Sequence, residues 1–243
     1  DDVFQFSVGL NGVGTKAVNA LSSDFEVTSF RDGKFTNAVF KQGILVKETS
    51  GKSDEANGTE VIFTPDEELF GDYAFNEDFI IARIWGYAYL NTGLSLEFNG
   101  RTFRSSKGLG DLLAKEVADE GLYTTIHHKG ERLEFAMTHV SGTYGESYFS
   151  YVNGQHTSDG GTHLSAFKEG IGKGISEHFK KNWSPQDVRE GIIGAIAVKI
   201  KSPIFESQTK NKLSNTEIRT WIVNEVKDAI IDFLLKNPKD AEK

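Results

Sequence analysis

The second half of the chain alternates between helical and β-strand patterns, and this feature constrains its fold more than any other. Within residues 162–181, Phe167, Ile171 and Ile175 recur four positions apart, a spacing that places them on one face of a helix. Residues 188–200 then form a run rich in valine and isoleucine, which is typical of a buried strand. Helices and strands mixed in this way indicate the α+β class.

Two further strands and a final helix are predicted in the same half. Residues 133–140 and 147–152 alternate apolar and polar side chains, and we expect these two strands to pair with each other. A last helix is predicted to start near Ser214, because Ser214 and Glu217 have the spacing of a capping box.

The first half also mixes strands and helices. Residues 25–46 alternate on both sides of Asp32-Gly33, which is a strong signal for a β-hairpin turn. The other elements predicted there are a helix at 15–21, a polar connection at 49–58, a strand at 59–63, a helix at 79–91 and a hairpin at 94–104.

Charge is unevenly distributed along the 243 residues. Residues 1–120 carry 11 basic and 20 acidic side chains, whereas residues 121–243 carry 16 basic and 15 acidic ones. This asymmetry predicts two domains with different surfaces, with a boundary between Lys107 and Gly121. It also weighs against nucleic-acid binding by the first half alone, because phosphate contacts need clustered lysine and arginine.

Several classes of protein are excluded by composition. The chain has no cysteine, so a disulfide framework, a zinc ribbon and a thiol nucleophile are ruled out. No apolar run approaches the roughly 18 residues that would span a membrane, and the first residues lack the pattern of a signal peptide. The missing cysteines do not exclude secretion, but nothing in the sequence argues for it, and we expect a cytoplasmic protein with no membrane partner.

The first candidate site is the glycine-rich segment 9–14, which precedes the predicted helix at 15–21. Glycines allow the backbone to approach a phosphate chain, and a helix N-terminus offers unpaired N–H groups. The spacing G-x-x-G-x-G differs from the Rossmann motif, and the segment is not a Walker A loop. The alternative is a tight loop that binds no ligand.

Two other segments contain residues that can carry chemistry. Lys210, in Gln208-Thr209-Lys210, can neutralise a phosphate as a point charge, although an ordinary solvated loop lysine is the alternative. His156, Asp159 and His163 suggest a metal site, but their spacing matches no known ligand set. We interpret the histidine segment as a strand end, a turn and a helix start.

Taken together and in this order, the segments resemble the ATPase subunits of bacterial type IIA DNA topoisomerases. Residues 9–22 are similar to the ATP lid of the gyrase and topoisomerase IV B subunits. Residues 153–170, centred on Asp-Gly-Gly-Thr-His, look like the signature of their transducer domain. Residues 187–191 followed by 205–213 look like the segment that ends in their Q-T-K loop.

The resemblance implies a role for each matching residue. Gln208 and Lys210 match the residues that reach the γ-phosphate of ATP. Thr59 matches a threonine in the hydrogen-bond network beside the adenine, and Arg31 matches an arginine that aminocoumarin inhibitors contact. The lid residues expected to wrap the triphosphate with backbone N–H groups are Leu10, Asn11, Gly12, Val13 and Gly14.

The resemblance also implies a fold and a set of partners. Residues 1–115 would be the C-terminal part of a GHKL (Bergerat) ATPase α/β sandwich, and residues 116–243 a transducer domain of ribosomal-protein-like βαβ fold. ATP and Mg²⁺ are the implied cofactors. The general base and the magnesium ligand of the family precede the lid, so we expect this chain alone to be an inactive fragment. DNA, the cleavage (A) subunit and a second copy in an ATP-bound homodimer are the implied partners.

Asn11 and Phe4 depart from the histidine and the tyrosine that are common in gyrase, which favours topoisomerase IV without deciding the question. Another GHKL-type ATPase and a non-catalytic interaction module are the alternative functions.

Overall fold

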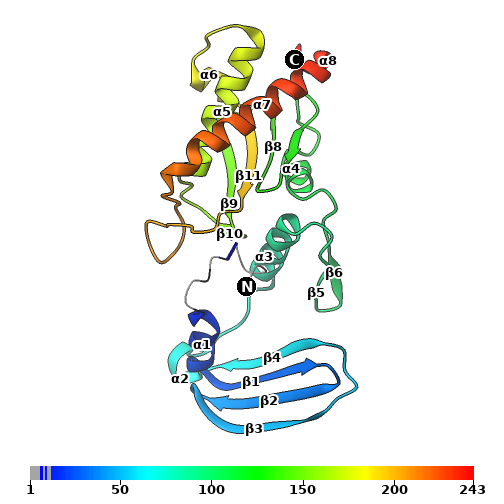
Figure 1. The fold of residues 1–243 in the computed structure, drawn as a ribbon, viewed down its shortest axis with the longest axis vertical. Coiled ribbons are helices and arrows are strands. Elements are labelled where there is room, and N and C mark those ends of the chain that lie inside the picture. Colours follow the sequence, from blue (N-terminus) through cyan, green and yellow to red (C-terminus); the bar gives the residue numbers. More distant parts are fainter. Residues whose placement is uncertain (1–5, 8, 10–11) are drawn as a thin grey trace. The chain divides into compact units, whose positions relative to one another are not determined.

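The chain forms two compact units in the computed structural model, which describes residues 6, 7, 9 and 12–243. The small unit is Gly9–Glu77, and the large unit is Asp78–Lys243 together with residues 6 and 7. Both contain helices and sheets (Figure 1), as the α+β prediction requires. The boundary predicted after residue 115 lies inside helix α4 (Leu109–Val117) of the large unit. The division into domains 1–115 and 116–243 stays a prediction.

A four-stranded antiparallel sheet in the order β3-β2-β1-β4 is the main element of the small unit (Figure 1). Its elements are α1 (Val13–Ala20), β1 (Ser22–Arg31), β2 (Lys34–Lys41), β3 (Ile44–Lys52), β4 (Gly58–Pro65) and α2 (Glu67–Phe70). Every residue of β3 is exposed. Residues 49–52, predicted as part of a polar connection, continue this edge strand, so that prediction is wrong there. An edge strand that is exposed on both faces buries no apolar side chains, so its sequence does not have to alternate between apolar and polar residues.

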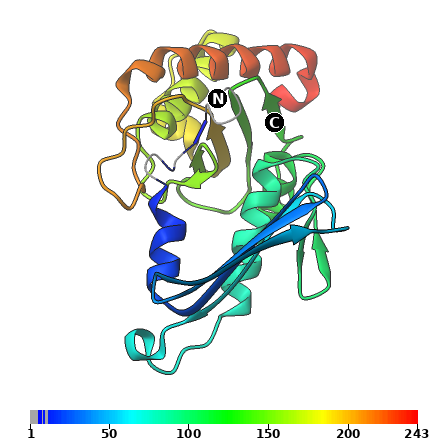
Figure 2. The same cartoon turned by 60° about the horizontal axis from the view of Figure 1, so that its bottom comes forward.

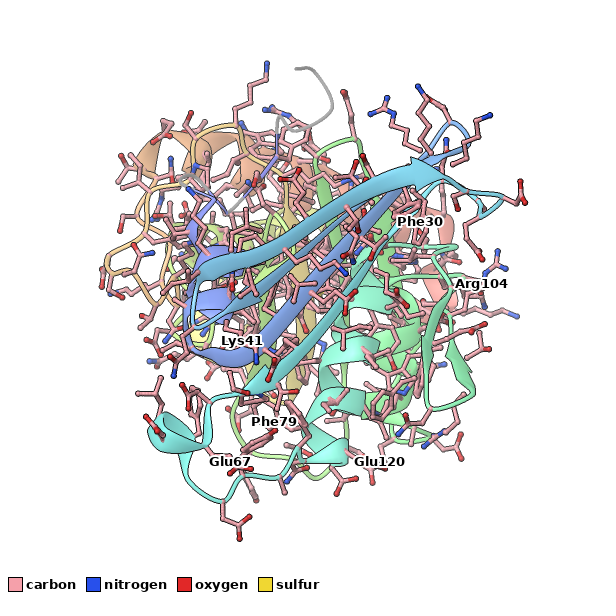
Figure 3. The ribbon with its side chains drawn as sticks, turned by 90° about the horizontal axis from the view of Figure 1, so that it is seen from below. Phe30, Lys41, Glu67, Phe79, Arg104 and Glu120 are labelled. Carbon is pink, nitrogen blue, oxygen red and sulfur yellow. The ribbon has the colours of Figure 1, made fainter. Side chains whose placement is uncertain are left out.

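The predicted hairpin of the small unit is confirmed. Asp32 and Gly33 both have positive φ angles, 52° and 75°, as a type I′ turn between antiparallel strands requires. Asn57 braces the turn, because its Oδ1 accepts a hydrogen bond from the Asp32 backbone N–H at 2.8 Å. The hairpin turn lies at the end of the sheet near Phe30, and Lys41 lies at the opposite end (Figure 3).

The large unit is a five-stranded sheet with helices on both faces (Figure 1). Its elements are α3 (Glu77–Leu90), β5 (Leu96–Phe98), β6 (Arg101–Phe103), α4, β7 (Ile126–Lys129), β8 (Leu133–His139), β9 (Ser147–Val152), β10 (Gln155–His156), α5 (Thr162–Phe179), α6 (Pro185–Arg189), β11 (Ile192–Val198), the short 3₁₀ helix η2 (Thr216–Ile218), α7 (Arg219–Lys236) and α8 (Pro238–Ala241). The helices predicted at 79–91 and 162–181 and the hairpin at 94–104 are confirmed. No helix in the described part of the chain has the length and apolar character needed to cross a membrane.

Strand β11 lies between β8 and β9 in the sheet order β10-β9-β11-β8-β7. It pairs antiparallel with β8 and parallel with β9. The expected direct pairing of 133–140 with 147–152 is therefore wrong. The chain leaves β9, crosses through α5 and α6 and returns as β11, and such a βαβ crossover places the returning strand parallel to the first.

Alternating residues of β11 face two different layers of helices. Ile192 and Ile196 are buried in the cluster that includes residues of α5 and α7. Ala195 is buried in a second cluster with Leu109 and Leu113 of α4. Period-two alternation in a strand covered on both faces explains the apolar run over β11. The strand predicted at 188–200 is wrong at its start, because residues 188 and 189 belong to α6.

Helices α5 and α7 lie side by side (Figure 2), and glycines of α5 that face α7 allow this close approach. A Cβ atom added to Gly170 would lie 2.8 Å from the Val226 Cβ and 3.0 Å from the Val223 carbonyl oxygen. A Cβ atom added to Gly174 would likewise lie 3.1 Å from the Ile230 Cβ. Gly172, on another face of the same helix, has no atom within 4 Å of an added Cβ.

This difference predicts opposite effects of two alanine substitutions in one helix. Gly170→Ala should lower the free energy of unfolding by about 1–3 kcal/mol, because the methyl group overpacks the contact with Val226. Gly172→Ala should raise it by about 0.5–1 kcal/mol, because alanine is the better helix former. Denaturant unfolding followed by tryptophan fluorescence measures both values, since all three tryptophans lie in the large unit. Equal effects of the two variants would contradict the packing argument.

A buried polar cluster connects β9 to the start of α5. Ser150 Oγ lies 2.7 Å from Thr157 Oγ1, which in turn lies 3.0 Å from His163 Nε2. The His163 side chain is fully buried, and its Nδ1 has no hydrogen-bond partner among the described residues. Burial lowers the pKa of His163 to about 4, so the imidazole is neutral at pH 7.

The lowered pKa of His163 predicts acid sensitivity with a defined sign. A group whose pKa is lower in the folded state than its unfolded value near 6.5 stabilises the fold above pH 6.5, and this contribution is lost as the pH falls towards 4. The loss should reach about 3 kcal/mol. His163→Asn, which cannot titrate, should flatten the pH dependence of the free energy of unfolding between pH 6.5 and 4. An unchanged slope in this variant would assign the acid sensitivity to other groups.

Candidate functional site

Gln208 and Lys210 lie in one tight turn of the large unit, between β11 and η2. The Lys210 backbone N–H donates to the Ser207 carbonyl oxygen at 3.0 Å, and Ser207 Oγ lies 2.5 Å from Thr209 Oγ1. Lys210 has a φ of 58°. Gln208 is exposed and Lys210 is half-buried. The structure thus brings together the two residues that the sequence singled out in this segment.

A short stem supports this turn. Phe205 and Leu213 form an antiparallel bridge, and the Glu206 N–H donates to the Lys212 carbonyl oxygen at 3.0 Å. The Lys212 ammonium is paired with the Glu206 carboxylate at 2.9 Å. The side chains of this pair are about half exposed, so the pair contributes little to stability.

Asn215 holds the base of the stem, and the sequence reasoning missed this residue. Its buried side chain accepts a hydrogen bond from the Ile204 N–H at 2.6 Å and donates to the Ser202 carbonyl oxygen at 3.0 Å. The predicted capping box of Ser214 and Glu217 is wrong. Asn215 occupies the N-cap position of η2 and makes no side-chain cap hydrogen bond, because its oxygen is used by Ile204.

Three of the proposed lid residues, Gly12, Val13 and Gly14, lie at the start of α1 in the small unit. Gly12 is the N-cap of α1, with a φ of 59°, and Gly12, Val13 and Gly14 are exposed. Within the described residues, no side chain caps this helix and its first turn holds no acidic residue. Leu10 and Asn11 lie outside the described residues. An uncapped helix start with open space around two glycines can receive an anion.

Thr59 and Arg31 lie on the same face of the small unit's sheet. Thr59 is paired with Ser29, and Arg31 follows Ser29 by two positions in β1; residues two apart in a strand share a face. Both residues are exposed, and Arg31 makes an ion pair of 3.7 Å with Asp32.

Helix α1 is anchored at the other end of this sheet. Ser22 Oγ, at the start of β1, donates to the Val18 carbonyl oxygen at 2.6 Å, whereas Arg31 ends β1 beside the hairpin turn. The structure therefore places Thr59 and Arg31 together on one face but does not bring Arg31 to the α1 end of the sheet.

The histidine segment has the structural role that the sequence interpretation favoured. His156 ends the short strand β10 and lies against Tyr151, with ring centroids 5.4 Å apart. His163 lies in the first turn of α5 and bonds to Thr157. Among the residues that the structure describes, no group of three or more His, Cys, Asp or Glu side chains could hold a metal ion.

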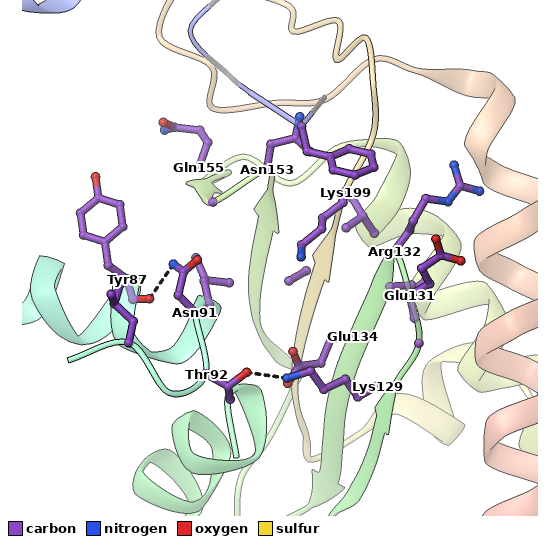
Figure 4. A pocket seen from close by; sticks show the side chains of 18 residues that line it. Tyr87, Asn91, Thr92, Lys129, Glu131, Arg132, Glu134, Asn153, Gln155 and Lys199 are labelled. Carbon is purple, nitrogen blue, oxygen red and sulfur yellow. Dashed lines mark hydrogen bonds between the residues drawn. The ribbon is translucent and has the colours of Figure 1, made fainter. Parts of the chain in front are cut away.

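A cavity of about 840 Å³, lined by both polar and apolar side chains, opens elsewhere in the large unit (Figure 4). It lies between the end of α3, the β7–β8 turn, the β9–β10 turn and the end of β11. Its charged lining residues are Lys129, Arg132, Lys199, Glu131 and Glu134. Three cationic and two anionic side chains line the cavity, so its charge favours neither an anionic nor a cationic ligand.

Asn153 ties the wall of this cavity together, and its importance was also missed. Its Oδ1 accepts from the Ile200 N–H at 2.8 Å, and its Nδ2 donates to the Ile200 carbonyl oxygen at 2.8 Å and to the Ser7 carbonyl oxygen at 3.2 Å. In the sequence, Asn153 stands out only as the first residue of the segment 153–170 that resembles the transducer signature.

Comparisons with known proteins agree over most of the chain. A family model described as DNA gyrase B matches residues 107–243. The B subunit of DNA topoisomerase 4 from Borreliella burgdorferi is 50% identical over 238 residues, which cover 98% of this chain and 40% of that protein. The B subunit of DNA gyrase from Clostridium acetobutylicum is 33% identical over 260 residues, with 97% and 40% covered. The chain thus spans about 40% of the length of these relatives.

Solved structures give the same result. The 43K ATPase domain of Thermus thermophilus gyrase B, in complex with an aminocoumarin, matches with a TM-score of 0.77 and 31% identity, covering 95% of this chain and 69% of that one. The ATP-binding domain of Francisella tularensis topoisomerase IV matches with a TM-score of 0.77 and 28% identity, covering 96% and 69%. Because the family model covers more than half of the chain and the fold agrees, the chain belongs to the DNA gyrase B family.

Proposed function

We propose that this chain is part of the ATPase subunit of a bacterial type IIA DNA topoisomerase, which passes one DNA duplex through another at the expense of ATP. The turn that presents Gln208 and Lys210 on a braced stem carries the proposal. In this function Lys210 neutralises charge on the γ-phosphate of ATP, and Gln208 donates a hydrogen bond to it. Catalysis of this kind depends mainly on positioning and on charge stabilisation.

The small unit supplies the ATP lid in this proposal. Exposed backbone N–H groups at the uncapped start of α1 suit the triphosphate. Leu10 and Asn11 are assigned to the lid by their match to the family motif alone. Mg²⁺ is expected with ATP, but the described residues include no cluster of His, Asp or Glu that fits it, so no step is assigned to the ion.

The remaining partners follow from the same proposal. DNA, the cleavage (A) subunit and a second copy joined by ATP are the proposed partners, and the cytoplasm is the proposed location. The T. thermophilus structure holds an aminocoumarin. Thr59 and Arg31, which share one exposed sheet face, are the residues that we propose for adenine-side contacts and for binding of such an inhibitor.

Replacement of one lysine tests the proposed ATPase. In the full-length protein that contains this chain, Lys210→Ala should lower kcat for ATP hydrolysis by roughly 10²–10³, the scale for the loss of one preorganised charge contact. Lys212→Ala is the matched control, because Lys212 lies in the same loop and its half-exposed pair with Glu206 contributes little to stability. Its kcat should stay within about threefold of wild type. Equal rates for Lys210→Ala and wild type would remove Lys210 from the mechanism.

Within the family we propose topoisomerase IV rather than gyrase. Asn11 and Phe4 depart from common gyrase residues, and identity to the B. burgdorferi topoisomerase 4 protein is 50%, against 33% for the C. acetobutylicum gyrase protein. The full-length protein mixed with its cleavage subunit and ATP should decatenate linked circles and relax supercoils. Introduction of negative supercoils into relaxed DNA would identify a gyrase instead. Intact protein that binds no nucleotide would favour a non-catalytic interaction module.

A further inference from the structure

The loop that carries Gln208 and Lys210 is fastened to the start of α5 by backbone contacts. Residues 159–162 run beside residues 211–213, and Gly161 forms a parallel bridge with Leu213. The Leu213 N–H donates to the Gly160 carbonyl oxygen at 3.1 Å, and the Thr162 N–H donates to the Leu213 carbonyl oxygen at 3.1 Å. These contacts join two segments that lie about fifty positions apart in the sequence.

A third backbone hydrogen bond continues the junction towards the turn. The Asp159 N–H donates to the Asn211 carbonyl oxygen at 3.0 Å. Asn211 follows Lys210 directly in the chain. The last contact of the junction is therefore one residue away from the lysine that the proposed function places at the γ-phosphate.

Only glycine fits at position 161, the centre of this junction. The φ of 127° and ψ of −161° of Gly161 belong to a region that is open essentially to glycine alone. A Cβ atom there would lie 2.5 Å from the Leu213 nitrogen and 2.9 Å from its Cα, and closer still to its carbonyl oxygen. These are backbone atoms, so no side-chain rotation relieves the clash.

Leu213 cannot easily move away, because its own side chain is fixed. It is 1% exposed and belongs to the core cluster that includes Ile171 of α5 and Ile222 of α7. Its backbone is also bridged to Phe205 across the stem. Because Leu213 is held on both sides, a Cβ atom at Gly161 would force the two segments apart, and the turn ending at Lys210 would lose its support from residues 159–162.

The neighbouring glycine differs in a useful way. Gly160 also has a positive φ, 67°, but an added Cβ would meet the Leu164 Cδ2, 2.8 Å away, which is the far end of a flexible side chain. The two glycines thus have separate roles. Gly160 permits the turn, and Gly161 permits the close approach of the Q-T-K stem.

We propose that Gly161 is a positioning residue that sets where Lys210 lies, by allowing the backbone of α5's first turn to contact Leu213. This inference rests on the proposed function, in which Lys210 contacts the γ-phosphate. It adds a physical link: the placement of the lysine is determined by the start of α5. Any displacement of α5 would carry the lysine with it.

Four forms of the full-length protein test the inference: Gly161→Ala, Lys210→Ala, the double variant and Gly142→Ala. Gly161→Ala should lower kcat for ATP hydrolysis by roughly 10–10², the scale of a misplacement near 1 Å. Gly142→Ala is the control, because Gly142 has a φ of 72° and open space around an added Cβ. It carries a backbone penalty without a clash, and its kcat should stay within about twofold of wild type.

Two readouts distinguish positioning from a general loss of structure. The affinity for ADP, which lacks the γ-phosphate, should be unchanged in Gly161→Ala, whereas damage to the whole nucleotide site would weaken it. The double variant should be no slower than Lys210→Ala alone, because residues that act through one contact have non-additive effects.

The outcomes separate the inference from the function on which it rests. A normal rate for Lys210→Ala contradicts the proposed function itself. A strong loss in Lys210→Ala with a normal rate in Gly161→Ala, or a further multiplicative loss in the double variant, overturns the role of Gly161.

A second variant decides the question if Gly161→Ala does not fold. Thr162→Pro removes the N–H that bonds to Leu213, at the first position of α5, where proline is well tolerated. It should reproduce the loss of kcat and the unchanged ADP affinity. It should also speed hydrogen exchange at the Leu213 amide. Wild-type kcat in a folded Thr162→Pro protein would overturn the inference.

Discussion

Contact between α5 and α7 is the interaction on which the rest of the large unit depends. Gly170 and Gly174 bring the α7 backbone close enough for Val226 and Ile230 to pack directly on α5. The two helices then cover one face of the sheet, and α5 provides most of the crossover that makes β11 parallel to β9. This arrangement also fixes the N-terminus of α5, against which the stem of the Q-T-K loop is built. A change in the packing of α5 on α7 would therefore alter the position of Lys210, because backbone contacts connect the start of α5 to the segment that follows the lysine.

Local sequence patterns predicted which segments form helices and strands better than they predicted which strands lie next to each other in the sheet. Apolar spacing identified α5, because one face of this helix is buried, and an unbroken apolar run identified β11, because both faces of this strand are covered. The neighbours of β8 and β9 could not be read in this way. Both strands alternate correctly, but which strand lies between them is decided by the crossover through α5, and periodicity carries no information about that order. The capping-box prediction was wrong for a related reason. The side chain of Asn215, at the N-cap position, accepts a hydrogen bond from the Ile204 N–H, and Ile204 lies eleven positions away in the sequence.

The candidate site shows the same limit at the level of single residues. Gln208, Lys210, Arg31 and Thr59 could be named from motifs because each motif is continuous in the sequence. Gly161 lies in the Asp-Gly-Gly-Thr-His motif, but the physical reason for a glycine there lies in the Leu213 backbone, which comes from a distant segment. Asn153 was missed for the same reason, because its amide bonds to Ile200 across the sheet end. Residues that hold a site together are thus harder to predict than residues that present its chemistry.

A rigid stem gives a lysine a physical advantage at a phosphate. Immobilising a lysine side chain costs up to about 2 kcal/mol in lost conformational entropy. A mobile loop would add a similar entropy cost for each backbone residue that has to be ordered. The turn at Ser207–Lys210, the stem bridge and the junction with α5 order the backbone before any ligand binds, so this part of the entropy cost is not paid on binding. The same rigidity has a consequence for coupling. A ligand shifts a conformational equilibrium only through contacts that differ between the two states. Residues 211–213, which follow Lys210, are bonded to the start of α5. Under the proposed function, a contact between Lys210 and the γ-phosphate would therefore favour the positions of α5 that allow it, and hydrolysis would remove that preference.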